Sequence, residues 1–208
     1  MSIARTLAAL AAGSALIALV PASANAAEVR GDHTVPRGAV VRGDLVVRGG
    51  DVLVLGTVLG DVRQSGSGSV TVGRSGEVTG RVVETGAGSV TVSGEVEGTV
   101  SESGSGSVRV TAHGEVGGVS ERGTGGVRVD AGGDVDGRLV ERGSGSVVVR
   151  GDVDRDVRES GRGHLTLHRT AEVEDSARES GDGNLYLHRG AEVDGQVRET
   201  GAGRLVRR

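Results

Sequence analysis

From residue 43 onward the chain repeats itself about every 20 residues, and this periodicity restricts the fold more than any other feature. Full copies occupy residues 60–79, 80–97, 98–117, 118–136, 137–154, 155–174 and 175–194, with a shorter copy at 43–59 and a truncated one at 195–208. The consensus is Gly-x-Val-x-Glu-x-Gly-x-Gly-x-Val-x-Val, a turn of variable length, and Gly-[Asp/Glu]-Val-[Asp/Glu]. Such a period is typical of solenoids, in which each unit packs against its neighbours.

Apolar and polar residues alternate within each copy, which indicates short strands. In residues 98–117 we expect Val100, Val108, Val110 and Val116 to point inward, and the Ser, Thr, Arg, Glu and Asp residues between them to face solvent. One copy buries too few valines to offset the loss of backbone entropy. Stability must therefore come from stacking, with each coil hydrogen-bonded to the coils before and after it.

The sequence predicts an all-β protein, a single-stranded parallel β-solenoid with about 8–9 coils of 17–20 residues. Parallel crossovers favour a right-handed β-helix, and the inward positions do not follow the six-residue period of left-handed hexapeptide helices. Length differences among the copies fall almost entirely at the turn after the second valine. We divide the chain into a signal peptide (1–26), an N-terminal cap and half coil (27–42) and a repeat domain (43–208).

The first 26 residues have the form of an export signal. Arg5 precedes the apolar run 7–20, and Ala24-Asn25-Ala26 is a small-x-small peptidase site. The run is shorter than the roughly 20 apolar residues that cross a bilayer. We therefore expect cleavage after Ala26, no membrane span in the mature chain, and a secreted or cell-surface location in a bacterium.

Composition excludes several classes of protein. Without cysteine the chain forms neither a disulfide scaffold nor a thiolate metal site. The formal net charge is −4 and Tyr186 is the only aromatic residue of the Phe, Trp and Tyr type, so we expect no nucleic-acid partner. The 39 glycines recur at fixed corner positions, which argues against a disordered low-complexity chain.

A glutamate followed by two glycines marks one corner of every later copy. Gly104 and Gly106 are one such pair, typical of a corner that needs positive φ or a close backbone approach. The stacked glutamates would either bind cations as a ladder or accept hydrogen bonds from corner amides, and we favour the second interpretation. These residues are Glu84, Glu102, Glu121, Glu141, Glu159, Glu179 and Glu199, with Gln64 in the first full copy.

A second acidic column requires countercharges, because like charges on neighbouring strands repel. We expect Arg81, Arg138 and Arg155 to answer it in a solvated ion-pair surface, and keep bound Ca²⁺ as the alternative. The stretch 181–187 is similar to the glycine-aspartate nonapeptide of calcium β-rolls, but most copies lack the aspartate ligand. We assign no metal-ligating residue. The column comprises Glu95, Glu97, Asp134, Asp136, Asp152, Asp154, Glu172, Glu174, Glu192 and Asp194.

Basic residues also recur near the C-terminus. His168 and His188 occupy equivalent places, but no third ligand repeats with them, so a solvated turn is favoured over a metal site. Arg158, Arg178 and Arg198 align as well. Residues 155–208 nevertheless contain ten Arg against ten Asp and Glu, and we expect no dedicated anion site.

Catalysis is not expected. Solenoid enzymes need a groove between long loops, and no copy carries a long insertion. A ladder of identical glutamates lacks the single asymmetric constellation of a catalytic site. We assign no catalytic and no cofactor-binding residue.

The residues 69–82, Ser-Val-Thr-Val-Gly-Arg-Ser-Gly-Glu-Val-Thr-Gly-Arg-Val, share the pattern V-x-V-x-x-x-G-x-V-x-G-x-V with residues 88–100. In this pattern, which covers most of residues 43–207, the sequence resembles bactofilins, polymer-forming bacterial β-helix proteins. The resemblance implies end-to-end assembly into nucleotide-independent, non-polar filaments. Secreted adhesin-like solenoids with S-G-x-V repeats are a second resemblance.

These observations favour an exported, non-catalytic structural protein that self-associates through its end coils. Open solenoid ends expose unpaired strand edges, which Val35-Pro36 at one end and Arg204, Arg207 and Arg208 at the other would partly block. The alternative is an adhesin-like module that binds a cell-wall polymer. The missing aromatic residues weaken this alternative, because they usually stack on sugars.

Overall fold

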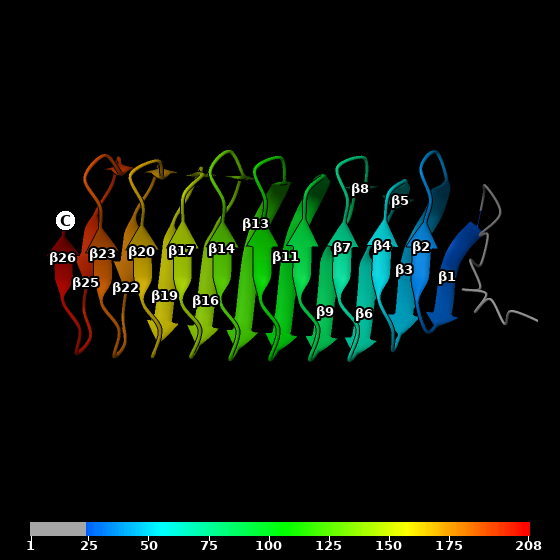
Figure 1. Cartoon of the computed structure of the whole chain (residues 1–208), viewed down its shortest axis with the longest axis horizontal. Coiled ribbons are helices and arrows are strands. Elements are labelled where there is room, and N and C mark those ends of the chain that lie inside the picture. Colours follow the sequence, from blue (N-terminus) through cyan, green and yellow to red (C-terminus); the bar gives the residue numbers. More distant parts are fainter. Residues whose placement is uncertain (1–23) are drawn as a thin grey trace, which may run out of the picture.

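The computed structural model describes residues 24–208, and residues 1–23, which hold most of the expected export signal, lie outside the described part. The described chain is all-β and forms a parallel β-solenoid of about nine turns, which confirms the predicted fold class. Figure 1 shows the coils stacked in one row along the long axis, with β1 (Ala24–Arg30) and β26 (Leu205–Arg207) at opposite ends.

Each coil contributes strands to three stacks, which we call the glutamate face, the ten-stranded face and the short-strand face. The glutamate face contains β1, β3 (Val40–Arg48), β6 (Val62–Gly66), β9 (Val82–Gly86), β11 (Glu95–Gly104), β13 (Glu115–Gly123), β16 (Leu139–Gly143), β19 (Val157–Gly161), β22 (Ala177–Glu179) and β25 (Val197–Glu199).

The ten-stranded face follows the two-glycine corner. It contains β2 (His33–Val35), β4 (Val52–Val54), β7 (Val70–Val72), β10 (Val90–Val92), β12 (Val108–Val110), β14 (Val127–Val129), β17 (Val147–Val149), β20 (Leu165–Leu167), β23 (Leu185–Leu187) and β26.

The short-strand face completes each coil. It contains β5 (Thr57–Leu59), β8 (Glu77–Val78), β15 (Asp134–Val135), β18 (Asp152–Val153), β21 (Glu172–Val173) and β24 (Glu192–Val193), together with the first residues of β3, β11 and β13.

The core consists of in-register columns of valine and leucine. On the ten-stranded face, for example, Val70 pairs with Val90 and Val90 pairs with Val108 in parallel strands. The four positions predicted to point inward in residues 98–117 are all fully buried, as predicted. Each column continues from coil to coil, so the apolar surface that one coil cannot bury by itself is covered by its neighbours.

The turn between the ten-stranded face and the short-strand face absorbs most of the length variation. Only Ser93 and Gly94 separate β10 from β11, whereas residues 111–114 separate β12 from β13. A smaller irregularity lies between β11 and β13, whose register shifts between Val96 and Thr99 of β11. The predicted position of the variation is therefore confirmed.

The two glycines of the corner have different reasons for being glycine. Gly86, the first of its pair, has φ of 145°, a conformation that L side chains rarely adopt. Gly106 is the second of its pair, and a Cβ added there would overlap the carbonyl oxygen of Gly88 in the preceding coil. Both reasons predicted for the pair, positive φ and close backbone approach, are present in the structure.

The N-terminal end is already part of the stack. In β1, Ala27 to Arg30 pair with Leu45 to Arg48 of β3, and the register becomes irregular between Asn25 and Ala27, next to the expected cleavage site. Residues 27–42, expected to be a cap and a half coil, contribute most of β1, all of β2 and the start of β3. No helix among residues 24–208 is long and apolar enough to cross a membrane.

Candidate functional site

The recurrent glutamates form a column inside the solenoid. In β11, Val100 and Glu102 are two residues apart and therefore lie on the same side of the strand. Both side chains are fully buried, so the prediction that the polar residues between the valines face solvent is wrong for these glutamates. The buried members of this column, the glutamate column, are Glu84, Glu102, Glu121, Glu141, Glu159 and Glu179.

Most of these carboxyl groups bind the following corner. The backbone N–H of Gly106 donates to Glu102 Oε1 at 3.0 Å, and the N–H of Gly145 donates to Glu141 Oε1 at 3.1 Å. The same bond recurs at Glu84 and Glu159. The interpretation that these glutamates accept hydrogen bonds from corner amides is confirmed at these four positions.

The second carboxyl oxygen has no partner. Oε2 of Glu102 and both oxygens of Glu121 are buried without a hydrogen-bond donor among the described residues. An ionised carboxylate only accepts hydrogen bonds, whereas a protonated carboxyl group also donates one. Since neighbouring carboxyl groups lie one coil apart, the column satisfies its free oxygens only when it carries protons.

Burial and mutual repulsion favour the protonated form. Burial, as the largest cause, and the adjacent carboxyl groups of Glu141 and Glu102 together raise the pKa of Glu121 to about 9. Burial is also the main reason that the pKa of Glu84 rises to about 7 and that of Glu179 to about 8. The column therefore holds protons around neutral pH and releases them as the solution becomes more alkaline.

The column changes character at its two ends. Gln64 takes the glutamate position in β6, pairs in register with Glu84 and donates a hydrogen bond from Nε2 to the carbonyl oxygen of Gly50 at 3.2 Å. At the other end, Glu199 lies in the last coil and is partly exposed. The buried carboxyl groups thus lie between a neutral amide in β6 and a partly exposed carboxyl group in the last coil.

The C-terminal coil has no coil beyond it among the described residues. Its strands β24, β25 and β26 each pair with one neighbour only. Leu205 is 37 % exposed, whereas its in-register partner Leu185 is fully buried. Arg207 pairs with Leu187, so it occupies a position that is apolar in the preceding coils.

At the other end of the solenoid, a buried histidine occupies the position equivalent to Leu205. His33 pairs with Val52, is almost fully buried, and neither ring nitrogen has a partner within the described chain. Burial lowers the pKa of His33. Sequence reasoning missed this residue, although its spacing from Val35 matches that of the paired valines in the later copies.

The second acidic column lies on the short-strand face, but the expected arginines do not pair with it. Arg81 forms its ion pair with Asp61 at 3.0 Å, and Arg138 pairs with Asp156 at 3.3 Å. The expectation that Arg81 and Arg138 neutralise the acidic column is therefore wrong. Both arginines lie at the corner after the column and form their ion pairs there with Asp61 and Asp156. No ion pair of Arg155 occurs among the described residues.

Partial burial and repulsion between neighbouring carboxylates on this face raise the pKa of Glu115. Glu115 pairs in register with Glu95 and Asp134. The pKa of Glu115 is raised by partial burial and by the nearby carboxylates of Asp136, Glu95 and Asp134. Within residues 24–208 no group of three or more His, Cys, Asp or Glu side chains is placed to hold a metal ion.

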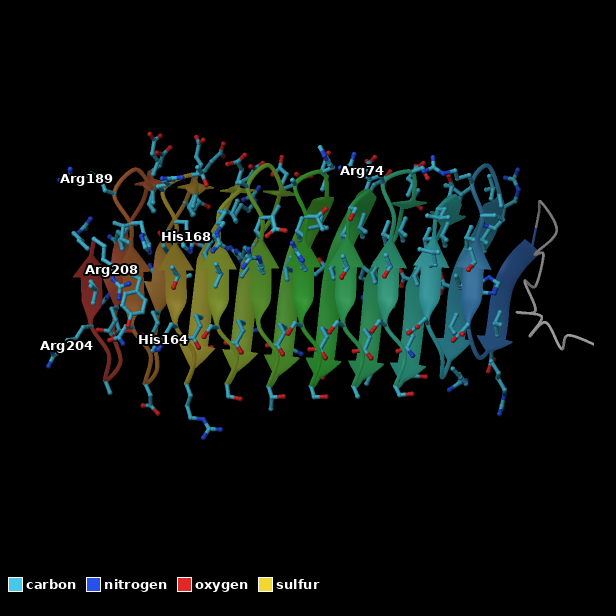
Figure 2. The ribbon with its side chains drawn as sticks, in the orientation of Figure 1. Arg74, His164, His168, Arg189, Arg204 and Arg208 are labelled. Atoms are coloured by element: carbon cyan, nitrogen blue, oxygen red, sulfur yellow. The ribbon has the colours of Figure 1, made fainter. Side chains whose placement is uncertain are left out.

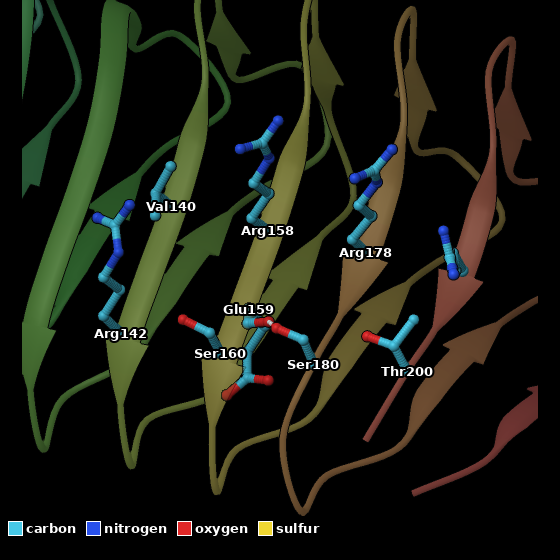
Figure 3. Close-up of a pocket in the computed structure, with 9 residues that line it drawn as sticks. Val140, Arg142, Arg158, Glu159, Ser160, Arg178, Ser180 and Thr200 are labelled. Carbon is cyan, nitrogen blue, oxygen red and sulfur yellow. Dashed lines mark hydrogen bonds between the residues drawn. The ribbon is translucent and has the colours of Figure 1, made fainter.

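The aligned arginines of the last coils form a row on the outside of the glutamate face. Arg158, Arg178 and Arg198 pair in register in β19, β22 and β25. They line a shallow cavity of about 460 Å³ together with the hydroxyl groups of Ser160, Ser180 and Thr200 (Figure 3). The Ser180 hydroxyl donates to the carbonyl oxygen of Glu159 at 3.4 Å, so this hydroxyl group is held by the backbone of the preceding coil.

The comparisons with known proteins identify no relative. No family model, no curated protein and no solved structure matches the chain. The β-helix class is therefore established by the structure alone, and the finer resemblance to bactofilins has no independent support.

Proposed function

We propose that the chain is an exported, non-catalytic structural protein of the cell surface that self-associates end to end. The observation that carries this proposal is the C-terminal coil, where β24, β25 and β26 each pair with only one neighbour among residues 24–208. Unpaired strand edges are templates for further strands. The resemblance of residues 69–82 and 88–100 to bactofilins supports the same function.

The backbone at this end is oriented for continued pairing. The N–H of Leu185 donates to the carbonyl oxygen of Arg204 in the next coil at 3.0 Å, and the N–H of Leu165 donates in the same way to Asn184. By equivalence, the N–H of Leu205 points beyond the last coil. A second copy stacked on this end would receive that hydrogen bond and cover the exposed part of the Leu205 side chain.

Arg207 limits this association without preventing it. An inward-pointing charge at a sheet edge disfavours stacking, because a neighbouring coil would have to bury it. Glu199 in the same coil provides an opposite charge that reduces the net charge of the end surface. We therefore expect association that depends on protein concentration.

The test uses residues 27–208, purified and observed by analytical ultracentrifugation and negative-stain electron microscopy over a range of concentrations. We expect rods that lengthen with concentration. Leu205→Pro removes the outward N–H and should leave monomers, whereas Leu205→Val keeps the N–H and should still assemble. Monomers at every concentration, or assembly of Leu205→Pro equal to that of the unchanged chain, would exclude end-to-end association at this coil.

Export is tested separately. Expression of the full chain in a bacterium, followed by mass spectrometry of the protein outside the cytoplasm, should give an N-terminus at Ala27. Retention of the uncleaved chain in the cytoplasm would contradict the proposed location without affecting the test of assembly.

A further inference from the structure

A basic pocket lies on the side of the solenoid, at the turn that follows the ten-stranded face. It has a volume of about 510 Å³. Figure 2 shows His168, Arg189 and Arg208 gathered in the last coils. The pocket is lined by Ala131, Arg150, His168, Arg169, Thr170, His188, Arg189 and Arg208.

The backbone ladder places these side chains in one column. The N–H of His168 donates to the carbonyl oxygen of Val149, immediately before Arg150, and the N–H of His188 donates to that of Leu167, immediately before His168. Arg208 follows in the last coil by the same bond to Leu187. Consecutive members are therefore one strand spacing apart, about 4.8 Å.

The charges of the pocket are unbalanced. Every ionisable side chain that lines it is basic, and none of its four arginines forms an ion pair with another described residue. The nearest carboxylate in the column, Asp130, precedes Arg150 and is already paired with Arg109 at 2.7 Å and Arg128 at 2.6 Å. Arg150 Nη1 is buried and has no partner within residues 24–208.

The two histidines record the same imbalance. Their rings are stacked, with centroids 4.6 Å apart and planes 14° apart. The pKa of His168 is lowered by burial first and then by the positive charges of Arg150, His188, Arg128 and Arg169, which face it from its own and the neighbouring coils. The His168 ring is therefore held in a basic environment, whose repulsion a bound anion would reduce.

Equal numbers of Arg and of Asp plus Glu in residues 155–208 led us to expect no dedicated anion site. The fold separates these charges in space. Glu159 and Glu179 are buried in the glutamate column, and Glu172 and Glu192 lie on the short-strand face. The basic side chains of His168, Arg169, His188, Arg189 and Arg208 line the pocket without them.

We propose that this pocket binds the phosphate groups of a linear anionic polymer that lies along the solenoid axis. Arginine guanidinium groups match phosphate oxygens in a two-pronged geometry, and each linked phosphate keeps its negative charge over the whole pH range of the test. Successive basic side chains along the axis favour several linked phosphates over one isolated ion. The site lies on the side of the solenoid and does not depend on self-association at its end.

Isothermal titration calorimetry with residues 27–208 tests the site, using inorganic phosphate, long-chain polyphosphate and polyglutamate as probes. We expect polyphosphate to bind, and single phosphate ions to bind at least about tenfold more weakly. If single phosphate ions bind as tightly as polyphosphate, the ligand is not a polymer. If polyglutamate binds as tightly, the site is not specific for phosphate. If no probe binds, the pocket is not an anion site.

Variants locate the site. Arg169→Gln/Arg189→Gln should weaken polyphosphate binding by about tenfold or more, because charge-assisted hydrogen bonds are lost. The matched control is Arg74→Gln/Arg122→Gln, which removes the same charge from other coils; Arg74 occupies the equivalent turn of an earlier coil (Figure 2). Equal losses in both variants would indicate non-specific attraction and overturn the proposal. Thermal unfolding of each variant verifies that the fold is retained.

The pH dependence provides an independent readout. Binding of an anion favours the protonated form of His168, so affinity should rise several-fold between pH 7.5 and 5.5. His168→Gln/His188→Gln should lose this dependence while keeping the arginine contacts. A pH dependence unchanged by that substitution would show that the histidines do not face the ligand.

Discussion

Glu121 and Glu141 lie directly opposite each other in neighbouring coils, and neither side chain is exposed to solvent. Two ionised carboxylates in that arrangement would repel each other in a region that water does not reach. The column of which they are part therefore links the stability of the solenoid to pH.

We predict that the protein loses stability as the pH rises. The pKa of an accessible glutamate is 4.5, whereas the pKa of Glu84 is raised to about 7 and that of Glu121 to about 9. Between pH 4.5 and about pH 9 the folded state therefore binds more protons than the unfolded state. The contribution of these protons to stability is complete below pH 4.5 and is lost as the pH rises to about 9. Circular dichroism should show a melting temperature lower at pH 9 than at pH 5, on the order of 5 °C.

The control for this prediction is Glu102→Gln/Glu121→Gln/Glu141→Gln, which removes three titrating groups while keeping their shape. Its melting temperature should change less over the same pH range. A melting temperature of the unchanged chain that is constant or rises from pH 5 to pH 9 would contradict the protonated column.

Glu121→Gln should stabilise the protein at pH 8. Both oxygens of Glu121 are buried without a donor, and the amide of glutamine donates to a neighbouring carboxylate without requiring a proton. Gln64 already occupies the equivalent position in the first full copy. We expect the free energy of unfolding in urea to increase by about 1 kcal/mol. Glu115→Gln, at an exposed position, is the control, and destabilisation by Glu121→Gln alone would refute the reasoning.

Gly106→Ala should destabilise the solenoid strongly. The added methyl group would overlap the carbonyl oxygen of Gly88, and backbone atoms of a stacked coil have little room to move. We expect a loss of about 3 kcal/mol in the free energy of unfolding. In Gly49→Ala nothing lies within 4 Å of the new atom and only the φ of 64° opposes it, so the loss should be about 1 kcal/mol. Similar losses in both variants would show that corner stacking is not tight.

Arg207→Val should strengthen end-to-end association. Valine at this position would continue the apolar column of the preceding coils, and covering it on association contributes free energy equivalent to about a tenfold gain in affinity. Sedimentation velocity measures the change. Arg204→Val removes the same charge from an exposed corner residue and should have a smaller effect. If both variants increase the association constant equally, the net charge of the end surface controls association and the core position of Arg207 does not.

Removal of divalent cations should leave the fold unchanged. The glutamate column has no access to solvent, and the acidic column of the short-strand face is not arranged as a metal site within residues 24–208. Circular dichroism and the melting temperature should therefore be the same with EDTA and with excess Ca²⁺. A higher melting temperature in Ca²⁺ would assign a cation to the acidic residues around Glu115.

The position of the glutamate column could have been predicted from the two-residue alternation of the strands. Glu102 follows Val100 by two residues, so a strand must place both on the same side, and that side is the core. We assigned the glutamates to solvent together with the other polar residues that lie between the valines. The corner amide of Gly106, which the repeated glycine pair did predict, provides one partner. A retained proton provides the other, and it is not visible in residue spacing.

The stacked coils, their lengths, the valine columns and the glycine corners could be predicted from the residues alone, because they depend on local periodicity and on the conformational freedom of glycine. Which charged groups meet is a property of the folded chain. Residues about 20 positions apart become neighbours through the coil register, which brings Arg150, His168 and His188 into one basic column while Glu179 is buried on another face. Charge interactions depend on distances between side chains of different coils, and these distances cannot be obtained by counting residues along the chain.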